Sequence, residues 1–294
     1  MLLTRITRRQ AIFGIATYGL STLFRFDSYA QGNPSKWSVL PDTPKLPKST
    51  RQGILPVNDT QIFYAQFGQG PSVLFLHGGL ANSNYWGAQI EELSKSFRVT
   101  VLDTRGHGRS PFNSGSLSYR LFASDVVEML KALGIPKTAV VGWSDGAITG
   151  IQLAISNGDL ISGLFAFGAN ISLNGLIPRG AESPVFRAFI TRAAREYASL
   201  SPHPEKWPEL TRALSRMWHT EPNFSKKQLA EIRCKVVVSD GDHDEIIKQE
   251  HTRQIASSIP GARLNIQRGV SHFAMLQDPI QFNDALNIFL RELL

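Results

Sequence analysis

A serine flanked by two glycines is the feature of this sequence that most directly suggests chemistry. The pentapeptide GWSDG at 142–146 fits the pattern G-x-S-x-G, in which a nucleophilic serine sits on a sharp turn between a strand and a helix. An apolar run, 138–141, precedes it, and a helical pattern, 147–154, follows it. Glycines suit such a turn because strand and helix approach closely there. We predict that Ser144 is a nucleophile; an ordinary glycine-serine loop is the alternative.

A serine hydroxyl needs a base to remove its proton and a carboxylate to orient that base. His272 lies in the segment GVSHF at 269–273, between the last apolar run and the C-terminal helical pattern. A loop at that strand end can reach the serine. The other six histidines fall in a helical pattern, in glycine-rich or Asp-rich turns, or in an irregular central segment. We therefore predict that His272 is the base.

Three aspartates compete for the role of the orienting acid. Asp240, Asp242 and Asp244 all follow the apolar run 236–238. The first two flank a glycine and have the obvious role of bonding backbone N–H groups of the turn, whereas Asp244 stands past the turn. The other common place for the acid, after the preceding apolar run, offers Asn170, which carries no charge. We predict Asp244, with Asp242 as the alternative.

Acyl transfer also develops negative charge on the carbonyl oxygen, which backbone N–H groups can stabilise. The N–H of Asp145, next to the nucleophile, is the first expected donor. The second is expected from the turn HGGL at 77–80, where we choose Gly79 and keep Leu80 as the alternative. Leu80, Trp143 and Asp145 are also expected to contact substrate. The carboxylate of Asp145 would attract a cationic substrate, although we prefer the interpretation that it caps the following helix.

Strand and helix patterns alternate along the chain. The expected buried strands are 73–76, 99–102, 139–141, 163–167, 236–238 and 264–266, and the expected helices are 86–94, 119–133, 145–156, 248–258 and 279–294. An alternating stretch at 53–67 predicts a β-hairpin. Such alternation predicts an α/β fold with a mostly parallel sheet and helices on both faces.

The segment 170–233 interrupts this alternation, because it holds no convincing buried strand. We predict a helical insertion there. Its aromatic side chains either line a substrate pocket or pack the insertion onto the main domain. These residues are Phe186, Phe189, Tyr197, Trp207 and Trp218.

The N-terminus has the pattern of an export signal. Residues 1–9 are basic, 10–24 form an uncharged run, and 28–30 supply small residues for cleavage. The sequence TRRQ at 7–10 favours a twin-arginine signal, with an ordinary secretory signal as the alternative. The uncharged run is shorter than a bilayer span, so we expect no permanent membrane anchor. A periplasmic or secreted bacterial protein is predicted.

Residues 31–52 follow this signal and contain four prolines. Such a composition resists helix and strand alike and predicts a tether or a wrapping arm. The main domain is expected over 53–294.

Composition excludes several classes of protein. With 42% hydrophobic and 19% charged residues in 294, the chain is globular. The net charge is +7, and it falls to +4 when residues 1–30 are left out, because 27 basic and 23 acidic residues then remain. No basic run with interleaved aromatics stands out. We therefore expect no nucleic-acid partner. Cys234 is the only cysteine, so no intrachain disulfide can form. No oligomeric state follows from the sequence.

Four motifs together resemble those of the α/β-hydrolase superfamily. They are HGG at 77–79, GWSDG at 142–146, GDHD at 241–244 and GVSHF at 269–273. The stretch 103–110 also resembles that family's D-x-R-G-x-G-x-S turn. Within the superfamily, GWSDG followed by GDHDEII is most similar to biphenyl-hydrolase-like and valacyclovir-hydrolase-like esterases.

The resemblance covers 53–294 and implies an eight-stranded sheet with a cap between strands six and seven. It also assigns nucleophile, acid and base to Ser144, Asp244 and His272.

The predicted function is the hydrolysis of small-molecule carboxylic esters through an acyl-serine intermediate, with no metal or organic cofactor. Lactone hydrolysis, carbon-carbon bond hydrolysis and perhydrolysis would use the same residues. Epoxide hydrolase and haloalkane dehalogenase activities are disfavoured, because those enzymes need an aspartate where this chain has Ser144. A non-catalytic binding protein on the hydrolase fold is a further alternative, as is a metal-dependent hydrolase built on the acidic turn 240–244.

Overall fold

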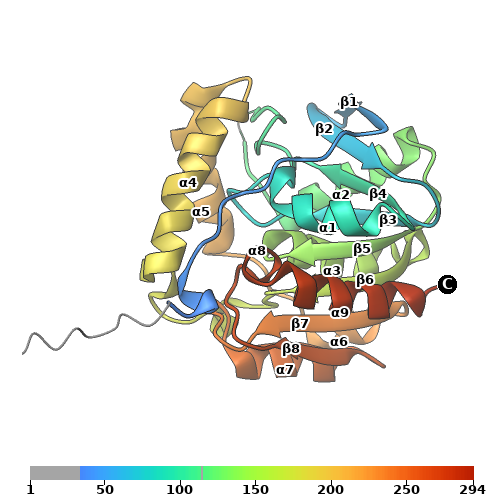
Figure 1. Cartoon of the computed structure of the whole chain (residues 1–294), viewed down its shortest axis with the longest axis vertical. Helices are drawn as coiled ribbons and strands as arrows, with labels where there is room; N and C mark the ends of the chain where they lie inside the picture. Colours follow the sequence, from blue (N-terminus) through green and yellow to red (C-terminus); the bar gives the residue numbers. More distant parts are fainter. Residues whose placement is uncertain (1–33, 114) are drawn as a thin grey trace, which may run out of the picture. The chain divides into compact units, whose positions relative to one another are not determined.

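Eight strands form one mixed sheet in the order β1-β2-β4-β3-β5-β6-β7-β8 (Figure 1). The computed structural model describes residues 34–113 and 115–294, so the predicted export signal at 1–30 lies outside the described residues. The strands are β1 (Arg51–Val57), β2 (Thr60–Phe67), β3 (Ser72–Leu76), β4 (Arg98–Leu102), β5 (Thr138–Trp143), β6 (Ile161–Phe167), β7 (Lys235–Gly241) and β8 (Arg263–Gln267). β2 pairs antiparallel with β1 and β4, and the pairs from β4 to β8 are parallel. The predicted eight-stranded, mostly parallel sheet is confirmed.

The predicted hairpin is β1 and β2, and it is longer than expected at its start. Arg51 pairs with Gln66, and Gln52 pairs with Ala65. The boundary expected at residue 53 is therefore wrong by two residues. Polar residues can occupy this position because β1 is an edge strand, where backbone pairing does not require burial of the side chain.

Helices cover both faces of the sheet. The helices are α1 (Gly87–Leu93), α2 (Tyr119–Ala132), α3 (Asp145–Ser156), α4 (Pro184–Leu200), α5 (Trp207–Trp218), α6 (Lys226–Ala230), α7 (Gln249–Ser258), α8 (Ala274–Gln277) and α9 (Pro279–Arg291), with short 3-10 turns at η1 (Lys36–Ser38), η2 (Ser83–Trp86), η3 (Gly158–Leu160), η4 (Leu173–Gly175), η5 (Gly180–Glu182) and η6 (Pro204–Lys206). Side chains of α2, α3 and α7 enter one buried cluster, and those of α1, α8 and α9 enter another.

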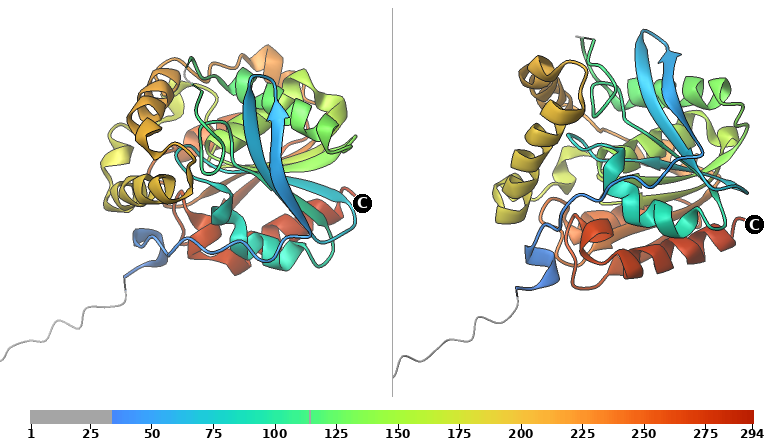
Figure 2. Two further views of the ribbon diagram at one scale, coloured as in Figure 1. Left: turned by 90° about the horizontal axis from the view of Figure 1, so that it is seen from above. Right: turned by 45° about the horizontal axis from the view of Figure 1, so that its top comes forward.

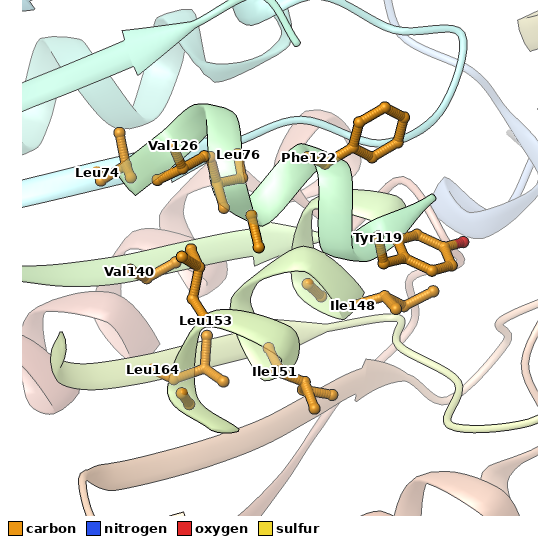
Figure 3. Packing of buried hydrophobic residues seen from close by; sticks show 14 of the residues in the cluster. Leu74, Leu76, Tyr119, Phe122, Val126, Val140, Ile148, Ile151, Leu153 and Leu164 are labelled. Carbon is orange, nitrogen blue, oxygen red and sulfur yellow. The ribbon is translucent and has the colours of Figure 1, made fainter. Parts of the chain in front are cut away.

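The two clusters lie on opposite faces of the sheet because side chains alternate along each strand. Leu74 and Leu76 of β3 belong to the first cluster, whereas Val73 and Phe75 belong to the second. Figure 3 shows Leu74, Leu76 and Val140 facing the side chains of α2 and α3. Burial of each such side chain stabilises the fold by roughly 2 kcal/mol.

The segment between β6 and β7, which the structure describes in full, contains helices and 3-10 turns but no strand. Helices α4 and α5 lie beyond the carboxyl ends of the parallel strands (Figures 1 and 2). Helix α6 instead contacts α7, and Leu229 on α6 is buried in the first cluster. The insertion predicted at 170–233 therefore covers the sheet edge only with α4, α5 and the loop before them.

Residues 34–50 form an arm that wraps along the outside of the domain (Figure 2). Leu40 and Leu46 pack against the second buried cluster. The guanidinium of Arg192 on α4 donates to the carbonyls of Leu40 and Pro41. Of the two expectations for this proline-rich segment, the structure shows the wrapping arm rather than the tether.

None of the helices within 34–113 and 115–294 combines the length and apolarity needed to cross a bilayer.

Candidate active site

Ser144 occupies the sharp turn between β5 and α3. Its backbone has φ 54° and ψ −120°, a region that residues with side chains rarely adopt. Its N–H donates to the carbonyl of Phe167 at 2.9 Å. A Cβ at Gly146 would lie 2.1 Å from the carbonyl oxygen of Leu76, and one at Gly142 would lie 2.4 Å from the oxygen of Gly146. Both flanking glycines are therefore required by the close approach of strand and helix.

His272 and Asp244 form a buried pair beside this turn. Nδ1 of His272 lies 2.6 Å from Oδ2 of Asp244. The other carboxylate oxygen of Asp244 accepts from the N–H groups of Ile246 and Ile247, at 2.7 and 2.8 Å. Gly168, with φ 62°, gives the ring its space, because a Cβ there would lie 2.8 Å from Cε1 of His272. Since Nδ1–H donates to the carboxylate, Nε2 is left as the acceptor of a proton.

The pair also sets the charges of both groups. Burial by itself would lower the pKa of His272, but the charge and hydrogen bond of Asp244 outweigh it and hold that pKa above its ordinary value. Burial acts oppositely on Asp244, yet His272 and the backbone donors keep the pKa of this carboxyl below its ordinary value. Asp244 therefore stays ionised and favours an imidazolium at His272.

The other two aspartates of the turn have different partners. Asp240 is fully buried and accepts from the Thr252 hydroxyl at 2.6 Å. Burial and the charge of Asp244 raise the pKa of Asp240 well above its ordinary value. Oδ1 of Asp242, the alternative acid, accepts from the N–H of Gly269 at 2.7 Å. The structure thus brings Asp244, and not Asp242, to His272.

Within the described ranges, the acidic turn 240–244 included, no group of three or more His, Cys, Asp or Glu side chains that could hold a metal ion is found.

Glu245 is a site residue that the sequence reasoning missed. Its Oε2 accepts from the N–H of His272 at 3.2 Å, and its Oε1 is buried without a hydrogen-bond partner in the described part of the chain. Burial, together with the charge of Asp244, raises the pKa of Glu245. Its position next to Asp244 in the sequence was the only available signal.

Ser144 and His272 line one cavity of about 320 Å³. Gly79, Leu80, Trp143 and Asp145 line it as well, so all the expected oxyanion-hole and substrate-contacting residues meet there. A Cβ at Gly79 would lie 2.4 Å from Oδ2 of Asp145 and 2.6 Å from the Trp218 ring, so only glycine fits. Leu80 has φ 64°, a strained value for its residue type. Asp145 begins α3, where backbone N–H groups have no acceptor within the helix.

The remaining walls of the cavity are mostly apolar and come from the insertion and the loop after Asp244. They include Leu176, Ile177, Phe186, Phe189, Ile190, Trp218, Ile246 and Ile247. The aromatic side chains of the insertion were expected either to line a pocket or to serve packing, and the structure shows some in each place. Phe186, Phe189 and Trp218 line the cavity, whereas Tyr197 and Trp207 pack on each other with ring centroids 5.2 Å apart.

Asp145 turns its side chain away from the helix that it was expected to cap. Its carboxylate accepts from the Tyr119 hydroxyl at 2.8 Å and from Nε1 of Trp218 at 2.9 Å. Among the described residues, no backbone N–H of α3 donates to it. Burial raises its pKa to about 6, although the donors Trp218 and Tyr119 oppose that rise. The preferred interpretation as a helix cap is therefore wrong, because the carboxylate lies in the cavity wall.

His77 and Asp103 hold the turns beneath the cavity through hydrogen bonds to the backbone. Nε2 of His77 accepts from the N–H of Thr104 at 3.0 Å, and Nδ1 of His77 bonds the carbonyl of Gly78 at 2.7 Å. Asp103, in the D-x-R-G-x-G-x-S stretch, accepts from the N–H of Ser83 at 2.7 Å and that of Arg109 at 2.8 Å. These contacts give both motifs a structural role.

Comparisons with known proteins agree with this fold. The family model described as "Alpha/beta hydrolase family" matches residues 73–285. The human protein named "Serine hydrolase BPHL" is 27% identical over 248 residues, covering 80% of this chain and 84% of that protein. The chain belongs to the alpha/beta hydrolase family.

Two solved structures share the fold. One is titled "Est816 as an N-Acyl homoserine lactone degrading enzyme", with a TM-score of 0.69 and 24% identity over 81% of this chain and 100% of that one. The other is the enol-lactonase from Burkholderia xenovorans LB400, with a TM-score of 0.66 and 22% identity over 81% of this chain and 100% of that one. At these identities the likeness shows the fold alone.

Proposed function

We propose that the protein is a serine hydrolase that cleaves carboxylic esters of small molecules through an acyl-serine intermediate. One observation carries the proposal: His272, paired with Asp244 at 2.6 Å, lines the same apolar cavity as Ser144 on its strained turn. This combination supplies a nucleophile, a base and an orienting acid. The cavity volume of about 320 Å³ suits a small substrate.

In the proposed reaction, Nε2 of His272 takes the proton of Ser144 as Oγ attacks the ester carbonyl carbon. The tetrahedral oxyanion is stabilised by the N–H of Asp145 and by that of Gly79 or Leu80. The imidazolium returns the proton to the leaving alcohol as the ester C–O bond breaks. His272 then deprotonates a water molecule that attacks the acyl-serine, and the imidazolium returns this proton to Oγ of Ser144 as the acyl C–O bond breaks and the acid is released.

The direct test is a panel of substrates offered to the purified chain without residues 1–30. The panel contains short p-nitrophenyl esters, lactones and cleavable diketones. We expect turnover of the esters and none of the diketones. Turnover of diketones alone would contradict the proposal.

Lactone hydrolysis is a second candidate. Two structures with the same fold are titled as lactone-degrading enzymes. A lactone is a cyclic ester, so the same acyl-serine chemistry applies to it. A kcat/KM for lactones well above that for open-chain esters of equal size would favour this candidate over the first.

Asp145 is proposed to favour substrates that carry an amine. Its carboxylate lies in the cavity wall, and Glu221 lines the same cavity, whereas Arg179 there is paired with Glu182 at 2.7 Å. We expect Asp145→Asn to reduce kcat/KM for an amine-bearing ester about tenfold more than for a neutral ester of the same size, because a charge-assisted hydrogen bond is lost.

Steady-state kinetics on a matched pair of esters measures this difference. The ratio of the two kcat/KM values should also fall as pH drops below about 6, where Asp145 becomes protonated. The ratio cancels the protonation of His272, which both substrates share. Equal losses for the two esters would remove the amine preference.

The pH dependence of ester hydrolysis should report His272. The base must be neutral to accept a proton, and Asp244 holds its pKa above the ordinary value of 6.5 despite burial. We therefore expect kcat/KM to fall on the acid side with a midpoint above 6.5, measured from pH 5 to 9. In Asp145→Asn the midpoint should move only slightly to lower pH, because Asp145 contributes less than Asp244 to the raised pKa of His272. A midpoint well below 6.5 would contradict the pairing with Asp244.

A further inference from the structure

The arm at 34–50 touches the loop that carries the proposed acid. The ring of Trp37 stacks on the ring of His243, with centroids 4.6 Å apart and planes 15° from parallel. His243 directly precedes Asp244, and its N–H donates to the carbonyl of Val270 at 3.0 Å. A contact with His243 therefore bears on the acid loop and on the neighbouring loop of the base.

The arm also reaches the loop that carries the proposed base, through Gln277 on α8. Nε2 of Gln277 donates to the carbonyl of Val39 at 2.9 Å and lies 3.2 Å from that of Trp37. The same side chain holds Ser271, since its Oε1 accepts the N–H of Ser271 at 2.7 Å and its Nε2 donates to the Ser271 hydroxyl at 3.0 Å. Ser271 directly precedes His272. Gln277 thus joins the arm to the residue before the base.

The location of these loops explains why they need support. They follow β7 and β8, and β8 is the last strand of the sheet, paired only with β7 on one side. Most of β8 is not buried, and Leu264 is 37% exposed. Val270 and Ser271 after this strand are nevertheless buried, so segments outside the sheet must enclose them, and Gln277 with the arm is one of these.

We propose that the arm is a positioning element of the active site, in which Trp37 and Gln277 hold the loops of Asp244 and His272 in the geometry required for proton transfer. This role rests on the proposed function. Displacement of a reacting group by about 1 Å can cost about 100-fold in rate, so modest loosening of these loops should lower kcat. The substrate cavity is lined by other residues, so KM should change little.

The test compares variants that remove the contacts of the arm with the two loops or with α4. Trp37→Ala removes the stack on His243, and Trp37→Phe restores a ring there. Gln277→Glu keeps an acceptor for the Ser271 N–H but loses the Nε2 donor to the arm and to the Ser271 hydroxyl. Arg192→Ala is the matched control, because it releases the arm from α4 without touching either loop.

Kinetics on a short ester, with active sites titrated by a fluorophosphonate and pH set on the plateau, gives the first readout. We expect kcat to fall about tenfold in Trp37→Ala and in Gln277→Glu, with KM nearly constant. Trp37→Phe and Arg192→Ala should stay close to the unmodified protein. Equal losses of kcat in Arg192→Ala and Trp37→Ala would show that the arm stabilises the whole domain rather than the two loops, and would overturn the proposal. Unchanged kcat in both Trp37→Ala and Gln277→Glu would also overturn it.

Hydrogen exchange in the Ser144→Ala background gives a second readout that needs no turnover. Peptides covering 268–276 should exchange faster when Trp37→Ala is added, whereas peptides of β5 should not change. Unchanged exchange at 268–276 would overturn the proposal. If the unmodified protein hydrolysed no ester, the proposed function would fail, while faster exchange would still show that the arm orders these loops.

Discussion

Ser144→Ala is expected to lower kcat for short p-nitrophenyl esters by about 10⁵-fold, because loss of the nucleophile removes the acyl-serine route altogether. The residual rate over water would come from the oxyanion donors and the cavity, which the substitution leaves in place. Alanine at this position keeps the backbone of the turn, where φ is 54°. Thermal unfolding should therefore change little, and the loss should lie in kcat.

The matched control is Ser172→Ala, in the loop after β6. This serine uses its carbonyl to bond Asn170, which an alanine preserves. Its kcat should equal that of the unmodified protein. Retention of ester turnover in Ser144→Ala would assign the reaction to another group.

Asp244→Asn is expected to lower kcat by about 10⁴-fold while leaving the fold intact. An amide at 244 can donate to Nδ1 of His272, which selects the tautomer with its proton on Nε2 and blocks acceptance of the serine proton. The ion pair is lost as well, so burial of His272 is no longer opposed by that charge. The acid midpoint of kcat/KM should then move to lower pH.

Asp242→Asn separates this effect from a general loss of charge in the turn. Asp242 bonds the N–H of Gly269 and does not touch His272. We expect the kcat of Asp242→Asn to remain within about threefold of that of the unmodified protein, because the substitution lies outside the reacting groups. A large loss in Asp242→Asn together with a small loss in Asp244→Asn would reverse the assignment of the acid.

The sequence predicts the sheet well because buried parallel strands are short apolar runs that stand out between helical patterns. The predicted strand 139–141 lies within β5 (Thr138–Trp143), and the predicted helix 145–156 coincides with α3 (Asp145–Ser156). One rule predicts Ser144, Asp244 and His272 as catalytic residues, since each follows a strand and the carboxyl ends of parallel strands meet at one edge. The start of β1 was missed because Arg51 and Gln52 are polar residues of an edge strand.

Contacts between distant segments could not be predicted in this way. The donors that turn Asp145 into the cavity wall are Tyr119 and Trp218, which lie 26 and 73 residues away. The bonds from Gln277 to the arm span 238 and 240 residues. Helix propensity and apolar periodicity are local signals, so neither carries information about these pairs. Only the packed tertiary structure reveals them.

The most direct measurement is to map the adduct that a fluorophosphonate forms with the purified chain, by mass spectrometry of its peptides. A serine activated by a paired histidine should react once, and the account predicts a single adduct on Ser144 that is lost in His272→Ala. An adduct on a different residue, or no adduct in a preparation that hydrolyses esters, would contradict it.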